Sequence, residues 1–315
     1  MIKSFIKKDL FYFLKSKQIF VFVFIVALIF AFDIFCNYAA AKDHYDSYTR
    51  VYQNCLDSDM DIEELMSADY EIETNKVGSG KQTLITNPLP YYYDKTIESV
   101  LSLHPFFLIG TIYAPVTAIA ALFVSVMGVM AVNDDIVHLT VKFYVVKYGK
   151  IKYMLLKMLG VLIRSLLVII ISTLIAFVLD IPFFLAAKND IPFEIPVVNI
   201  NDISLSATLK QILFALFVFA LYALLGAFIG VLTRNTLVSS ALFWVISLMP
   251  FDLKYLPGCI VNSIAKDIYT FNGNFASVSA DIECNYLSYC IIIVLPVISV
   301  ISAVMVFKKR SSYIS

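Results

Sequence analysis

Residues 19–38 read IFVFVFIVALIFAFDIFCNY, a run with a single charged side chain, Asp33. At about 1.5 Å of rise per helical residue, this run covers about 30 Å, the thickness of the hydrocarbon core of a bilayer. No small-x-small cleavage site follows it, so the sequence predicts a retained membrane anchor and not a cleaved signal peptide. The composition agrees, because 60% of the 315 residues are apolar and 15% are charged. A soluble globular protein is excluded, since roughly 25% of its residues would be charged.

Apolar runs recur along the rest of the chain and predict an all-α membrane protein with six transmembrane helices. The predicted segments are an interfacial helix at 1–17, the first span at 18–40, a large extracellular segment at 41–104, the second span at 105–132, a cytoplasmic loop at 133–153, the third span at 154–180, an extracellular loop at 181–211, the fourth span at 212–232, the fifth at 237–250, an extracellular segment at 251–286, the sixth span at 287–307 and a tail at 308–315. The fifth stretch is short, and a re-entrant or tilted segment fits it equally well.

The charges between the apolar runs predict the orientation of the chain. Segments 1–17, 133–157, 233–236 and 308–315 together hold fourteen basic and three acidic residues, whereas the outer segments, with Asp180 at the end of the third span included, hold nine basic and twenty acidic residues. Lys and Arg are retained on the cytoplasmic side of a membrane, so both termini are predicted to be cytoplasmic. Lys heavily outnumbers Arg, which favours an AT-rich bacterial source, and we expect a multi-pass protein of the plasma membrane.

The first residues of the chain have an amphipathic pattern. Ile2, Phe5, Ile6, Leu10 and Phe13 fall at helical spacing on one face. This pattern predicts a helix that lies in the headgroup layer before the first span. A basic flank that only fixes the topology is the alternative.

The sequence contains no complete catalytic or metal-binding motif. The string Gly78-Ser79-Gly80-Lys81 resembles the end of a phosphate-binding loop, but that motif requires Gly at the position of Asn75 and Ser or Thr at the position of Gln82. The three histidines are scattered, without the spacing of metal ligands. The sequence therefore predicts no enzyme site, no metal and no nucleic-acid partner. Whether Cys259 and Cys284 form a disulfide is left open.

Two charges lie inside the predicted spans and away from the ends of the third span, where Lys157 and Asp180 stand. Charged residues at membrane depth are costly and often functional, so Asp33 and Arg164 are candidates for a substrate path. The alternative is that Arg164 extends toward the cytoplasmic interface and that Asp33 reaches headgroups or a partner.

Small residues at helical spacing in the second and fourth spans predict close helix packing, either within the chain or between two subunits. These residues are Gly110, Ala114, Ala118, Gly128, Gly226 and Gly230.

The inner loop after the second span carries acidic residues, a Leu139-Thr140 pair and then Lys150 and Lys157. With the six-span layout, this run resembles the membrane (permease) subunit of an ABC-2-type ABC transporter, although Leu139 stands where that family has Gly and Lys150 where it has Arg. The resemblance implies an exporter of an amphiphilic peptide, lipid-like or drug-like substrate. A separate ABC ATP-binding subunit would hold ATP and Mg, and this chain would hold no cofactor.

The same resemblance implies that two membrane subunits, identical or different, pair in the bilayer and that the inner loop couples them to the ATPase. The residues implied in this coupling are Asp134, Asp135, Thr140, Lys142, Lys147 and Lys150. Two other classes stay open from the residues alone. One is a secondary transporter or channel, and the other is a membrane-anchored capture or immunity protein whose acidic outer segment binds a cationic ligand.

Overall fold

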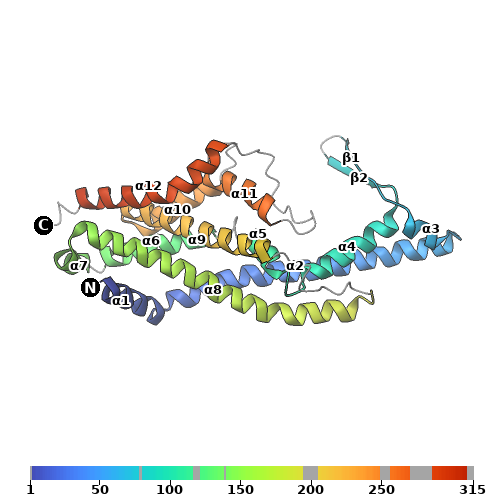
Figure 1. The fold of residues 1–315 in the computed structure, drawn as a ribbon, viewed down its shortest axis with the longest axis horizontal. Helices are drawn as coiled ribbons and strands as arrows, with labels where there is room; N and C mark the ends of the chain where they lie inside the picture. The colour runs from blue at the N-terminus through green and yellow to red at the C-terminus, as the bar shows by residue number, and fades with distance from the viewer. Residues whose placement is uncertain are drawn as a thin grey trace. The chain divides into compact units, whose positions relative to one another are not determined.

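The computed structural model describes residues 2–77, 80–115, 121–137, 140–193, 205–248, 256–269 and 286–310. In this part of the chain nearly all residues lie in helices, and one short antiparallel hairpin is present. Four helices are long and apolar enough to cross a membrane (Figure 1): α2 (Gln18–Asp57), α8 (Lys150–Asp190), α9 (Leu205–Thr233) and α12 (Tyr286–Arg310). The prediction of a helical membrane protein is confirmed.

A fifth span would arise from two helices that meet at a sharp bend. Helix α6 (Ala121–Val137) and helix α7 (Val141–Tyr148) are bent by 85° relative to each other. Helix α10 (Thr236–Leu248), where the fifth span was expected, is shorter and also apolar. The total of six spans stays a prediction.

Several helices have different bounds from the expected segments. Helix α2 continues to Asp57, beyond the expected end of the first span at residue 40, and α8 continues to Asp190. Residues 39–57 contain neither Gly nor Pro, so nothing ends the helix where the apolar run ends. Hydropathy marks the apolar length, whereas helix ends depend on breaking and capping residues.

The remaining elements were not assigned from the sequence. Helix α5 (Leu108–Pro115) occupies the start of the expected second span. The expected extracellular segments contain α3 (Ile62–Ser67), strands β1 (Ile72–Val77) and β2 (Gly80–Ile85), α4 (Pro88–Ser102) and α11 (Pro257–Ile268). Asp61 caps α3 by accepting hydrogen bonds from the backbone N–H groups of Glu63 and Glu64.

The chain divides into two compact units. The first contains residues 1–30, 109–176 and 204–315, and the second contains residues 31–108 and 177–203. In the first unit α9 packs against α6, α10 and α12. Its buried core includes Val218, Tyr222 and Phe243, with Ile260 of α11 and Ile292 of α12.

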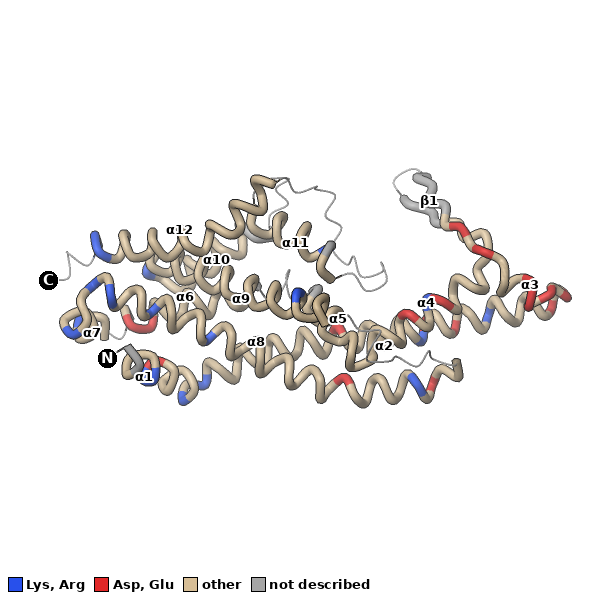
Figure 2. The backbone as a smooth tube through the Cα atoms, in the orientation of Figure 1, with Lys and Arg blue, Asp and Glu red and all other residues tan. Residues whose placement is uncertain are grey.

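The second unit is held together by aromatic contacts. The ring of Phe193 packs against Tyr45, Tyr48 and Tyr93, at centroid distances of 5.3, 4.9 and 4.8 Å. The strands pair antiparallel, with Ile72 opposite Ile85. Figure 2 shows acidic residues gathered on α3 and basic residues on α1, on α7 and at the end of α12.

Candidate functional site

The N-terminal helix is anchored in the first unit by one aromatic side chain. Helix α1 (Ile2–Lys15) buries Phe5, whose ring meets the edges or faces of Tyr144, Tyr148 and Tyr153 at centroid distances of 5.5, 5.4 and 6.1 Å. Two of these tyrosines belong to α7 and the third to α8. The amphipathic face of α1 therefore packs on protein at this end of the helix.

Asp9, on the same face of α1, binds two cations of α8. Its carboxylate accepts a hydrogen bond from Nε of Arg164 at 3.1 Å, and Nη2 of the same guanidinium lies 2.7 Å from the other carboxylate oxygen as an ion pair. It also accepts a hydrogen bond from Nζ of Lys157 at 3.0 Å. The side chains of Asp9, Arg164 and Lys157 are 9, 7 and 4% exposed. The ion pairs are therefore nearly free of solvent screening.

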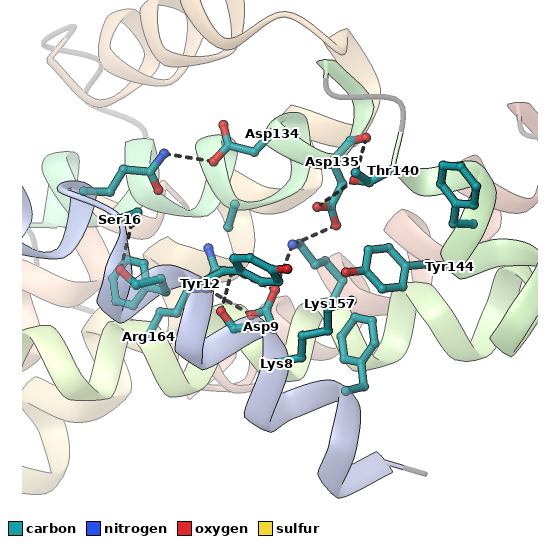
Figure 3. Close-up of a pocket in the computed structure, with 15 residues that line it drawn as sticks. Lys8, Asp9, Tyr12, Ser16, Asp134, Asp135, Thr140, Tyr144, Lys157 and Arg164 are labelled. Carbon is teal, nitrogen blue, oxygen red and sulfur yellow. Dashed lines mark hydrogen bonds and ion pairs between the residues drawn. The ribbon is translucent and has the colours of Figure 1, made fainter.

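Lys157 also bridges to α6. Its Nζ lies 2.8 Å from Oδ2 of Asp135, and the Tyr153 hydroxyl donates to the same oxygen at 2.6 Å. Thr140, directly before α7, donates its hydroxyl to Oδ1 of Asp135 at 3.3 Å. Figure 3 shows Lys157 between the two carboxylates. Two cations and two carboxylates thus connect α1, α6 and α8 into one buried network, and Thr140 attaches the start of α7 to it.

The network alters the proton affinity of Asp9. Burial by itself raises the pKa of this carboxyl, but the charges and hydrogen bonds of Lys157 and Arg164 outweigh burial. The pKa therefore lies below its ordinary value of 3.8. Asp9 is ionised at neutral pH and holds both cations.

Helix α7 presents an apolar and basic surface formed by exposed side chains. Phe143 and Val146 are 79 and 89% exposed, and Lys142 and Lys147 are exposed beside them. The helix ends at Gly149, whose φ of 80° is a conformation that favours glycine. We call the exposed side chains of Lys142, Phe143, Val146 and Lys147 the α7 surface.

The residues implied in coupling divide between the network and the α7 surface. Asp135 and Thr140 are in the network, Lys142 and Lys147 are on the α7 surface, and Lys150 begins α8. Asp134 lies beside the network and accepts a hydrogen bond from Nε2 of Gln18 at 2.9 Å. His138 and Leu139 lie outside the described residues.

The two candidates for a substrate path belong to different units of the chain. Arg164 is in the first unit, bound to Asp9, which favours an anchoring role for this residue. Asp33 belongs to the second unit, where Nδ2 of Asn37 lies 3.5 Å from its carboxylate.

The glycines of the second and fourth spans allow α6 and α9 to meet backbone to backbone. A Cβ on Gly128 would overlap the carbonyl oxygen of Ala223, and a Cβ on Gly226 would overlap that of Ser125. Gly230 faces Val129 in the same contact.

Other residues from the packing and disulfide predictions lie elsewhere. Gly110 faces the side chain of Gln211 on α9. Ala114 lies in α5, while Ala118 and Cys284 fall outside the described residues.

Sequence reasoning missed Asp9 and Asp180 as residues of interest. Asp9 is the single acidic residue among residues 1–17 and lies four positions from both Phe5 and Phe13, so the spacing placed it on the packed face. Asp180 is fully buried, and within the described chain neither of its carboxylate oxygens has a hydrogen-bond partner.

The described residues contain no group of three side chains placed to hold a metal ion. Comparison of the chain with protein-family models, with curated proteins and with solved structures finds no match.

Proposed function

We propose that this chain is the membrane subunit of an ATP-driven exporter of the ABC-2 type, in a bacterial plasma membrane. In this proposal the chain has six spans and both termini in the cytoplasm, and ATP hydrolysis takes place on a separate subunit. The substrate is an amphiphilic peptide, lipid-like or drug-like molecule that passes between two membrane subunits.

The α7 surface carries the proposal. Helix α7 follows the apolar helix α6 at an 85° bend and exposes Phe143 and Val146, which offer an apolar contact of the kind that anchors protein interfaces. The flanking lysines suit a partner whose groove has an acidic rim. The network behind α7 gives this helix a rigid support, because Asp135 and Lys157 are held by charged hydrogen bonds on several sides.

The same contacts provide a path for force. A partner that moves α7 pulls on Thr140 and on the stacked rings of Tyr144 and Tyr153, whose centroids are 5.9 Å apart. Tyr153, Lys157 and Arg164 all belong to α8, so the pull reaches a long apolar helix. Domain movements in the motor would thereby change the packing of the spans.

The test is co-purification of an ATPase with the full-length chain from its own host in mild detergent. We expect a co-eluting ATPase activity that the pair Lys147→Glu and Lys150→Glu removes while the amount of inserted chain is unchanged. Lys15→Glu on α1, also an exposed lysine in a predicted cytoplasmic segment, is the matched control and should retain the activity. Absence of any ATPase from the wild-type preparation, with activity in cells that depends on an ion gradient, would favour the secondary transporter.

A further inference from the structure

A cavity of about 580 Å³ lies beside the buried network. Its walls come from α1, α6, α7, α8 and the start of α2, and Figure 3 shows the residues that line it. Cavities of this size hold small organic ligands, which usually need an apolar lining with a few fixed polar groups. Here the apolar part is largely aromatic and includes Phe5, Tyr12, Phe143 and Tyr144.

Most charges on the cavity wall already have partners. Asp9, Asp135, Lys157 and Arg164 neutralise one another within the network. Lys8 and Asp134 also line the cavity, and among the described residues neither has an ion-pair partner within 4 Å. One free cation and one free carboxylate therefore face the same space, and the cavity as a whole carries no net charge.

The surroundings of these two charges suit a zwitterion. The Lys8 ammonium lies 5.7 Å from the ring centre of Tyr12 and 5.6 Å from that of Tyr144, with its hydrogen-bond donors otherwise available for an anion. Asp134 accepts one hydrogen bond from Gln18 and retains acceptor capacity for an ammonium group. The exposed rings of Tyr12 and Phe143 add the aromatic faces that attract organic cations.

The position of α1 points to a lipid as the source of the zwitterion. Tyr12 contributes to the cavity and is itself exposed on α1, next to the exposed side chains of Phe11 and Leu14. An amphipathic helix with such residues buries them at the level of the phospholipid headgroups. A headgroup in the adjoining leaflet is therefore within reach of the cavity, whereas a soluble metabolite would have to enter from water.

We propose that this cavity binds the headgroup of a zwitterionic phospholipid, with the phosphate against Lys8 and the ammonium against Asp134. A bound headgroup connects α1 to α6 across the open side of the network and fills the space under Tyr144 of α7. This inference does not depend on the proposed motor, because it concerns only groups of this chain.

The experiment is native mass spectrometry of the delipidated full-length chain in detergent, titrated separately with phosphatidylethanolamine and with phosphatidylglycerol of the same acyl chains. We expect preferential retention of phosphatidylethanolamine, and about a tenfold loss of that retention in both Lys8→Gln and Asp134→Asn. Lys15→Gln and Asp59→Asn change exposed residues outside the cavity and should bind like the wild type.

Two outcomes would overturn the proposal. The first is stronger retention of phosphatidylglycerol that Lys8→Gln and Lys15→Gln weaken equally, because this would be binding to general positive charge. The second is full displacement of the lipid by soluble phosphoethanolamine at the same concentration, which would refute the assignment to a lipid. If Asp134→Asn does not fold, Tyr12→Leu replaces it, since this exposed ring contributes to the cavity and is expected to reduce retention as well.

Discussion

Replacing Asp9 with Asn tests the buried network directly. Among the described residues, Arg164 has its ion pair with Asp9 alone, whereas Lys157 keeps Asp135 at 2.8 Å when Asp9 is neutral. Removing one partner of a buried pair costs about 3–5 kcal/mol because the other charge stays buried without compensation. Since only Arg164 loses its carboxylate entirely, we expect Asp9→Asn to lower the free energy of unfolding by about 3 kcal/mol. This is more than a hundredfold change in the folding equilibrium.

The assay is unfolding of the full-length chain by SDS in mixed micelles. The one tryptophan, Trp244 on α10, reports unfolding by its fluorescence, and circular dichroism reports the loss of helix. The control is Lys95→Gln, which breaks the Lys95–Glu98 pair, where the side chains are 20 and 25% exposed and the expected cost is about 0–1 kcal/mol. Asp9→Asn combined with Arg164→Met should recover part of the loss. Equal costs for Asp9→Asn and Lys95→Gln would refute the account of the network as a buried support.

Because the pKa of Asp9 is lowered in the folded state, its contribution to stability is complete above about pH 4 and is lost as the pH falls through the folded pKa. SDS titrations at pH 7, 5 and 3.5 should show this loss in the wild type and its absence in Asp9→Asn. Gly226→Leu should lower the free energy of unfolding by about 1–3 kcal/mol or more, because the new leucine side chain would overlap the Ser125 carbonyl oxygen. A lower SDS midpoint would show this loss. Gly149→Ala should lower the free energy of unfolding by about 1–2 kcal/mol, because its φ is positive. No atom would crowd the new Cβ, so backbone strain is the whole cost, and a loss equal to that of Gly226→Leu would contradict the distinction between strain and overlap. Asp180→Leu should stabilise the chain by about 1 kcal/mol by removing a buried carboxyl group that has no partner among the described residues, and a lower midpoint would refute this.

The helical membrane fold was predictable because it depends on local composition. A run such as residues 19–38 must be helical in lipid, since only internal hydrogen bonds satisfy its backbone there. The bounds of α2 were not predictable in this way, because the helix continues through polar residues to Asp57. The helical spacing of apolar residues in α1 was visible in the sequence, but the prediction that this face lies in the headgroup layer stays a prediction, because Phe5 and Phe13 are buried against protein.

The candidate site was only partly predictable. Asp135 and Thr140 were selected through a resemblance, and the structure places both in the network. Asp9, which connects α1 to this network, was not selected, because Asp9 and Arg164 are 155 positions apart in the sequence. Which face of α1 meets which turn of α8 depends on helix packing, which a single sequence does not specify.

The separation between Asp9 and Arg164 has a consequence for how the chain is made. The ribosome must add about 150 more residues after Asp9 before its two cations exist, which takes roughly 8–30 s at typical speeds of synthesis. During that interval the Asp9 carboxylate has neither of its cations to bind. The amino terminus is thus fixed in place late in biogenesis, after Lys157 and Arg164 of α8 have been added.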